Sequence, residues 1–313
     1  MRRPPNTAVA YVLLLAVLAI GHVLVQRSHL YQLEGLERGF GGKGGRRATQ
    51  DLASVARQVE VLLNISVPVL LDKSSLAPKQ AGVGFSCGES HVVKLKGYGE
   101  LQRARNLSKV LPDIDVFSGS EGGRGKAFDN CAVVGNSGTL LESEFGNDID
   151  SHDVVFRFNQ GITEGYEPHV GKKTTFRILN KHQSGAAVEV GEKTISTIRE
   201  MSQLRAWVRS TLEHPRRAAL VFDPEFLCYC WSWVGRRGHK PSSGLVGIVL
   251  ALKSCHSTTI FGFSSSSYYN SEERPHYYDW ERPAKGRERV HPFQYEQKLY
   301  HHLHDLGYLS IRS

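Results

Sequence analysis

The sequence predicts an α/β fold with a mostly parallel β-sheet that is covered by helices on both faces. Short apolar segments alternate with stretches of helical length, which lie at 194–213 and 243–255. The apolar segments predict buried strands at 131–135, 153–158, 218–223 and 258–263. Such alternation is typical of a parallel sheet, and ligands of these sheets bind at the carboxyl ends of the strands.

The size and charge of the chain limit its partners. Its 313 residues suffice for one large domain or two ordinary ones, and its formal net charge is +8. A basic balance fits an anionic partner such as a nucleic acid, an acidic membrane surface or a phosphorylated small molecule. The basic residues are scattered and no nucleic-acid-binding motif is recognisable, so we do not expect a nucleic acid partner.

The N-terminus predicts a membrane anchor. Arg2 and Arg3 precede an apolar segment at 8–25, whose 18 residues are near the lower limit for a spanning helix, roughly 17–25. A cleavable signal peptide is the alternative, but its apolar region usually has about 7–15 residues and a clear cleavage site follows it. We therefore expect residues 1–7 to be a cytoplasmic tail and 8–25 a retained signal-anchor, with the rest lumenal.

The region after the anchor predicts a stem before the folded domain. Residues 26–47 are polar and end in a flexible Gly/Lys/Arg spacer, 48–63 have the pattern of an amphipathic helix, and the next residues resemble a linker. We therefore expect a stem at 26–80 and a single folded domain at 81–313.

Two further features fit a lumenal domain. Asn64 and Asn106 begin N-x-S triplets that can accept N-linked glycans. The five cysteines are compatible with disulfides and leave one odd thiol: Cys87, Cys131, Cys228, Cys230 and Cys255. A zinc site is disfavoured because only one residue separates Cys228 from Cys230 and no matching second pair exists.

The loop after the first predicted strand is a candidate nucleotide loop. Gly135 and Gly138 would let the backbone approach a ligand, and Asn136 and Ser137 would present short polar side chains. The loop lacks the lysine of a P-loop, and an ordinary strand-to-helix turn is an equally good interpretation.

Four segments in order carry a resemblance to a known family. Residues 131–179 resemble the large sialyl motif of eukaryotic sialyltransferases, glycosyltransferase family 29, and 239–263 resemble the small motif. The tetrapeptide at 276–279 resembles the third motif, and His291 with Glu296 resembles the very small motif. The four motifs extend over 131–296, which is more than half of the chain.

The resemblance implies a GT-A-like, Rossmann-type variant that uses a CMP-activated nine-carbon acidic sugar without a metal or other cofactor. It implies that the nucleotide and its phosphate are contacted by Asn136, Ser137 and Asn159. It implies that the cytidine-phosphate or carboxylate end of the donor is contacted by Ser242, Ser243 and Gly244. It also implies a disulfide between Cys131 and Cys255, which would close a long loop and stabilise the fold by about 3–5 kcal/mol.

The implied reaction needs two groups that handle protons or charge. Displacement at the anomeric carbon passes through an oxocarbenium-like state, so the acceptor hydroxyl needs a base and the departing phosphate needs a stabiliser. We expect His291 to be the base and His276 to hydrogen-bond the phosphate, with Tyr277 and Tyr278 lining the site.

The position of His291 supports its role in this interpretation. Pro292 is suited to the first position of a helix, which would make His291 the N-cap, where the helix dipole keeps the imidazole neutral. Glu296 would orient a neighbouring group without transferring a proton.

Other motifs compete for a functional interpretation. The D-x-D pattern of metal-dependent sugar-nucleotide transferases occurs at 113–115 and 148–150, but a single donor phosphate needs a metal less, so we expect turn or helix-flanking roles. His301 and His304 fit a solvated helix face. The aromatic segment at 226–233 fits either the core, which we favour, or an acceptor platform.

Together these observations predict an inverting glycosyltransferase of the Golgi membrane, single-pass type II. It would move sialic acid from CMP-sialic acid to a hydroxyl of a terminal galactose-type sugar on a glycoprotein or glycolipid. One alternative keeps the fold but changes the donor to a CMP-3-deoxy-ulosonic acid or UDP-galactose. The other is an inactive lumenal binding protein, against which the presence of both histidines argues.

Overall fold

The computed structural model describes residues 52–117, 126–180, 192–215, 219–263, 274–282 and 286–312. These residues belong to one compact unit, Leu52–Ser313. Their strands form a parallel sheet in the order β5-β4-β3-β2-β1-β6-β7. The strands are β1 Phe128–Val134, β2 Val154–Phe158, β3 Phe176–Leu179, β4 Lys193–Ser196, β5 Leu220–Val221, β6 Cys255–Phe261 and β7 Ser310–Arg312. The parallel sheet that the sequence predicts is therefore confirmed.

The strand order changes direction at β1. Successive strands from β1 to β5 are added on one side of β1, whereas β6 and β7 are added on its other side. This arrangement creates a topological switch point between β1 and β6, where ligands of open α/β sheets bind at the carboxyl ends of the strands.

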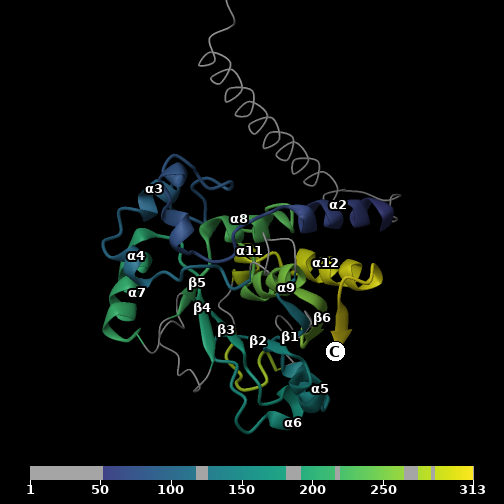
Figure 1. The fold of residues 1–313 in the computed structure, drawn as a ribbon. Coiled ribbons are helices and arrows are strands. Elements are labelled where there is room, and N and C mark those ends of the chain that lie inside the picture. The colour runs from purple at the N-terminus through teal and green to yellow at the C-terminus, as the bar shows by residue number, and fades with distance from the viewer. Residues whose placement is uncertain are drawn as a thin grey trace, which may run out of the picture. The chain divides into compact units, whose positions relative to one another are not determined.

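Helices lie on both faces of the sheet (Figure 1). The longer helices are α2 Leu52–Asn64, α7 Met201–Glu213, α8 Pro224–Ser232, α9 Ser243–Ser254 and α12 Phe293–Asp305. The shorter ones are α3 Tyr98–Leu101, α4 Leu107–Val110, α5 Gly146–Asp150, α6 Glu167–Val170 and α11 Arg287–Val290, with 3-10 turns η1 Lys73–Leu76, η2 Pro78–Gln80 and η3 Gly138–Glu142. Figure 1 shows α2, α8, α9 and α12 on one side of the sheet and α5 with α6 on the other.

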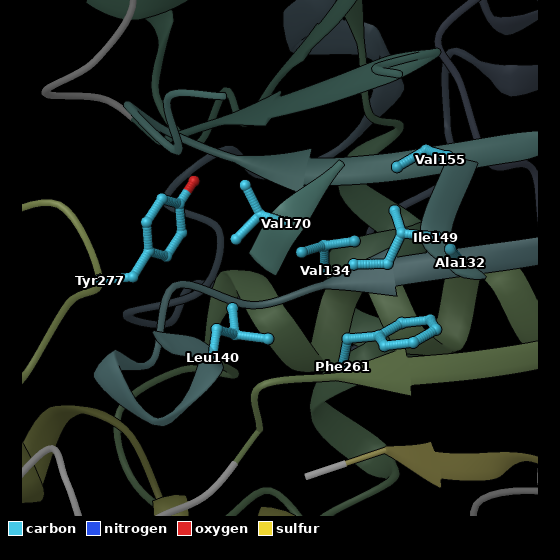
Figure 2. Close-up of a cluster of buried hydrophobic side chains, with 8 residues drawn as sticks. All are labelled: Ala132, Val134, Leu140, Ile149, Val155, Val170, Phe261 and Tyr277. Carbon is cyan, nitrogen blue, oxygen red and sulfur yellow. The ribbon is translucent and has the colours of Figure 1, made fainter. Parts of the chain in front are cut away.

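The face toward α5 and α6 holds a cluster of apolar side chains (Figure 2). Alternate residues of β1 point into it, as the two-residue period of a strand requires, together with single residues of β2, β6, η3, α5 and α6. Its fully buried members are Ala132, Val134, Leu140, Ile149, Val155, Val170, Phe261 and Tyr277. Tyr277 comes from the third motif, so the core itself anchors that segment.

The opposite face of the sheet packs against α9. Gly247 of this helix lies so close to the Phe158 ring that an added Cβ would come within 2.5 Å of a ring carbon. Cys131 of β1 and Cys255 at the start of β6 form a disulfide, with their Cα atoms 6.1 Å apart. The disulfide joins the two strands that border the switch point.

Two features of the fold correct the sequence interpretation. The helix expected at 194–213 is two elements, because the β-branched segment at 194–196 pairs with β3 as part of β4 and the helix α7 begins only at Met201. Strands β3 and β7 were not predicted, since β3 has Arg177 at its centre and β7 has mostly exposed residues.

Part of the region expected to be the stem, from Leu52 onward, lies in the same compact unit as the rest of the described residues. Helix α2 buries Val55, Val59 and Leu62. It is also bonded to the domain, since the Tyr229 hydroxyl donates to the Leu62 carbonyl at 2.7 Å and the Lys253 amine to that of Leu63 at 2.9 Å. Helix α2, within the region expected to be the stem, therefore packs against the rest of the compact unit.

The expected cytoplasmic tail, signal-anchor and Gly-rich spacer lie outside the described residues. Among the residues that are described, no helix has the length and apolar character needed to cross a membrane.

Candidate active site

The loops that leave β1 and β6 meet closely at the switch point. The Gly135 amide donates to the Phe261 carbonyl at 2.8 Å, and a Cβ on Gly135 would lie 2.4 Å from the Gly262 carbonyl oxygen. Gly262 has φ +66°, a left-handed conformation that glycine adopts without strain. These glycines bring Asn136 and Ser137, which follow β1, to the carboxyl edge of the sheet.

The N-terminus of α9 lies at the same edge, because this helix runs antiparallel to the strand that follows it. The Ser242 hydroxyl is the N-cap and accepts from the Leu245 amide at 3.0 Å. The same hydroxyl donates a hydrogen bond to the Glu296 carboxylate at 2.6 Å, and the Ser242 amide donates a second one at 2.8 Å. Ser242 therefore holds the helix end, and the half-buried Ser243 and Gly244 are the residues presented at it.

Glu296 is a buried carboxyl that joins α12 to α9. Only 1% of its surface is exposed, and the Tyr300 hydroxyl donates to it at 3.3 Å in addition to the two bonds from Ser242. Burial raises the pKa of Glu296 to about 7, although the hydrogen bonds from Ser242 act in the opposite direction. The neighbouring group that Glu296 was expected to orient corresponds to Ser242 in the structure.

His276 is oriented by a carboxylate. Its Nδ1 lies 2.9 Å from an Asp279 carboxylate oxygen, and its ring stacks on Tyr278 with the ring centroids 5.3 Å apart. Because a carboxylate only accepts, Nδ1 carries the proton, and Nε2 is the nitrogen whose proton can be exchanged. Sequence reasoning did not assign Asp279 a role, although its position three residues after a histidine was visible.

The segment that carries His276 closes directly over the nucleotide loop. The Tyr277 amide donates to the Asn136 carbonyl at 3.0 Å, and the Asn136 side-chain amide donates to the Tyr278 hydroxyl at 3.2 Å. A Cβ on Gly138 would lie 2.2 Å from the Arg274 carbonyl oxygen. The structure therefore brings His276, Tyr278 and Asn136 together, although about 140 residues separate them in the chain.

Asn159 follows β2 at the same edge. Its φ of +51° is left-handed, and its side-chain oxygen accepts from the Asn180 amide at 3.0 Å. The buried Arg177 holds this loop by donating to the carbonyls of Asn159 and Gly161, and it forms an ion pair with the buried Glu192. Sequence reasoning missed this ion pair because nothing in the local pattern marks either residue.

The position expected for His291 is corrected by one residue. Helix α12 begins at Phe293 and its N-cap is Pro292, whose φ of −82° and ψ of +54° are not helical. His291 therefore precedes the N-cap, and its carbonyl accepts from the Phe293 amide at 2.9 Å. Since the dipole effect weakens rapidly beyond the first turn, it supports a neutral His291 less strongly than the sequence interpretation assumed.

The segment at 238–240 supports the backbone next to His291. The His239 amide donates to the Val290 carbonyl at 2.9 Å, and a Cβ on Gly238 would lie 2.9 Å from a Pro292 ring carbon. Since 239–263 is the segment compared with the small motif, the structure brings that segment into contact with the very small one.

The D-x-D segments have structural roles in the fold. The buried Asp115 carboxylate accepts from the amides of Val69, Leu70 and Phe117, and the Asp150 carboxylate accepts from those of Lys172 and Lys173. Within the described residues there is no group of three or more histidine, cysteine or acidic side chains that could hold a metal ion.

The remaining candidates are distributed around the domain. Cys87 pairs with Cys228, and Cys230 is buried and forms no disulfide. The aromatic segment at 226–233 mainly belongs to the core, as we favoured. His301 and His304 are exposed on α12, while the glycan acceptors Asn64 and Asn106 are exposed and half-buried, respectively.

A comparison with protein families decides the classification of the domain. The family model of glycosyltransferase family 29 (sialyltransferase) matches residues 86–194 and 188–308, which include the whole switch-point edge. The chain belongs to this family. The motifs that resemble those of sialyltransferases are therefore family motifs, and the resemblance is confirmed.

Relatives and solved structures are consistent with this classification. The chain is 33% identical to the CMP-N-acetylneuraminate-beta-galactosamide-alpha-2,3-sialyltransferase 1 of Gallus gallus over 173 residues, 50% of this chain and 48% of that one. It is 29% identical to the sialyltransferase-like protein 2 of Arabidopsis thaliana over 210 residues, 66% of this chain and 43% of that one. The chain spans about half the length of these relatives. A crystal structure of a mammalian sialyltransferase superposes with a TM-score of 0.55 at 28% identity, covering 66% of this chain and 76% of that one.

Proposed function

We propose that the chain is an inverting glycosyltransferase that moves sialic acid from CMP-sialic acid to a hydroxyl of a terminal galactose-type sugar on a glycoprotein or glycolipid glycan. The observation that carries the proposal is the family match, since the matched residues include both histidines and all the loops at the switch point. The names of the animal relatives, CMP-N-acetylneuraminate-beta-galactosamide-alpha-2,3-sialyltransferases, favour this donor and acceptor class.

The donor would bind with its anionic end at the first turn of α9. Ser243 and Gly244 are half-buried there, and a helix N-terminus with its amides favours a negative charge. A Cβ on Gly244 would lie 2.8 Å from the Phe263 ring, so a larger residue at this position would have to displace that ring. Asn136, Ser137 and Asn159 would contact the nucleotide from the loops that follow β1 and β2.

Two histidines would carry the chemistry. His276, whose Nδ1 is held by Asp279, would use Nε2 to hydrogen-bond the departing phosphate. His291 would accept the proton of the attacking acceptor hydroxyl through its imidazole. The bond from the donor's anomeric carbon to the phosphate would break as the bond to the acceptor oxygen forms on the opposite face, and CMP would leave.

The proposal extends to the location of the protein. We place residues 1–7 in the cytoplasm, 8–25 in the Golgi membrane and the domain in the lumen, because of the apolar segment and the two arginines before it. Protease protection of an N-terminal and a C-terminal tag in sealed microsomes tests this orientation. Protection of the N-terminal tag instead of the C-terminal one would contradict it.

The decisive assay incubates the full chain with CMP-sialic acid and a panel of galactosides, with and without EDTA. We expect transfer in both conditions. Absence of both transfer and CMP release would exclude the sialyltransferase reaction, and a strict requirement for a divalent ion would favour the UDP-galactose alternative.

The base assignment is tested by His291→Ala. Transfer should fall by roughly 10²–10⁴-fold, the usual contribution of a general base, while CMP still binds. His301→Ala is the matched control, because His301 is an exposed histidine on α12, the helix that follows His291. Full activity of the His291 variant would show that another group takes the proton.

A further inference from the structure

Trp280 is a tryptophan that the fold leaves largely exposed. Of its surface, 62% is accessible, whereas Trp233 is 1% exposed. The indole nitrogens of Trp207 and Trp231, which are half-buried, donate to the carbonyls of Ala219 and Arg237. Tryptophan is strongly buried on average, and so a large exposed indole is an informative exception.

The exposed indole is held close to the candidate active site. The Arg274 guanidinium lies over the Trp280 ring, 5.5 Å from its centroid, and the Arg274 Nε donates to the His276 carbonyl at 3.0 Å. Asp279, the residue before Trp280, accepts from His276. Since four residues span at most about 14 Å, Trp280 lies within the reach of a short saccharide bound beside His276.

The contacts around Trp280 leave much of the side chain accessible to a ligand. Arg274 lies over the ring, and 62% of the residue's surface nevertheless remains exposed. An arginine above an aromatic ring also restricts its orientation, because the cation is attracted to the ring face. The indole is therefore both oriented and accessible, as a binding platform must be.

The two substrates require different chemistry. The donor is anionic, and the α9 N-terminus and His276 provide for its charge. The acceptor is a neutral saccharide, and the C–H groups on one face of a galactose-type ring form an apolar surface that packs well against an aromatic ring. The aromatic segment at 226–233 cannot supply this surface, because α8 buries most of it in the core.

We propose that Trp280 is the stacking platform for the acceptor saccharide and determines the affinity for it. This inference rests on the proposed function, and it deepens that function by assigning a subsite for the acceptor rather than for the donor. It requires that removal of the indole weakens acceptor binding and leaves donor binding unchanged.

The experiment compares Trp280→Ala and Trp280→Phe with the unmodified full chain. Initial rates are measured while a β-galactoside disaccharide and CMP-sialic acid are varied separately. We expect the alanine variant to raise the KM for the disaccharide roughly 10-fold, the size of one lost aromatic contact, and the phenylalanine variant to retain most of the affinity. The KM for CMP-sialic acid and the slow release of CMP without acceptor should not change.

Ile114→Ala is the matched control. Ile114 is 75% exposed and lies in the 113–115 segment, so its removal also deletes an exposed apolar side chain. Both KM values should stay at those of the unmodified chain. An unchanged disaccharide KM in Trp280→Ala, or a parallel change in both KM values, would overturn the proposal.

A binding measurement separates this inference from the proposed function. The disaccharide alone is titrated into the full chain while tryptophan fluorescence is recorded, and the titration is repeated with Trp280→Phe. A saturable change that requires Trp280 supports the platform even if no sialic acid is transferred. No change in the unmodified chain overturns the platform even if transfer occurs.

Discussion

Replacing Glu296 by glutamine is expected to remove a pH-dependent loss of stability from the protein. Glu296 is fully buried and receives three hydrogen bonds, two from Ser242 and one from Tyr300. Glutamine has nearly the same shape and keeps an oxygen acceptor for the Ser242 amide, but it cannot ionise. The substitution therefore isolates the effect of the buried charge.

The sign and size follow from the pKa. Burial raises the pKa of Glu296 from the ordinary 4.5 to about 7, so the folded protein binds this proton more tightly than the unfolded chain does. The contribution of Glu296 to the free energy of unfolding is highest below pH 4.5, decreases as the pH rises from 4.5 to 7, and stays reduced above 7. At about 1.4 kcal/mol for each pKa unit, the full decrease is about 3 kcal/mol.

Urea unfolding between pH 4.5 and 8, followed by tryptophan fluorescence, measures this term. The free energy of unfolding of Glu296→Gln minus that of the unmodified protein should grow by about 3 kcal/mol over this range. Glu60→Gln, an exposed substitution on α2, should follow the unmodified protein at every pH. Parallel profiles for the Glu296 variant and the unmodified protein would refute the reasoning.

Two further predictions concern packing. Gly135→Ala should lower the free energy of unfolding by about 1–3 kcal/mol and weaken CMP binding, because its Cβ would meet the Gly262 carbonyl at 2.4 Å. Gly82→Ala, whose Cβ would meet no atom within 4 Å, is the control in urea unfolding and CMP titration, and equal effects of the two would contradict the reasoning. A chain that begins at residue 66 lacks α2 and should melt well below one that begins at Leu52, since burying each aliphatic residue of α2 contributes about 1.5–3 kcal/mol. Equal melting temperatures would show that α2 is dispensable.

The sequence revealed the centre of the fold better than its edges. Strand β2 is buried throughout, and β1 and β6 are buried mainly toward their carboxyl ends, where apolar residues gather and the sequence can identify them. Strand β3 is also buried throughout, but the charged Arg177 within it argues against a buried strand when the sequence is taken alone. The structure shows that Glu192, fifteen residues further along the chain, forms an ion pair with Arg177. Tertiary pairing of this kind leaves no local periodicity to detect.

The candidate site was predictable as a set of residues but not as a set of contacts. The motifs identified Ser242 and Glu296 separately, whereas the structure shows that the serine hydroxyl donates a hydrogen bond to the glutamate carboxylate. That bond depends on how α12 crosses the end of α9, and 54 residues separate its partners. The same limit applies to His291, whose place before the N-cap depends on the ψ angle of Pro292.

The disulfide between β1 and β6 has a consequence for the order of events during biosynthesis. Cys131 emerges from the ribosome before Cys228 and Cys230, and its partner Cys255 is the last cysteine to be made. Pairing in order of appearance would therefore join the wrong thiols, and the correct bond requires that the two strands have already met. Once the domain has closed, burial raises the pKa of Cys230, and this thiol, the odd one of the five, is kept from thiol–disulfide exchange.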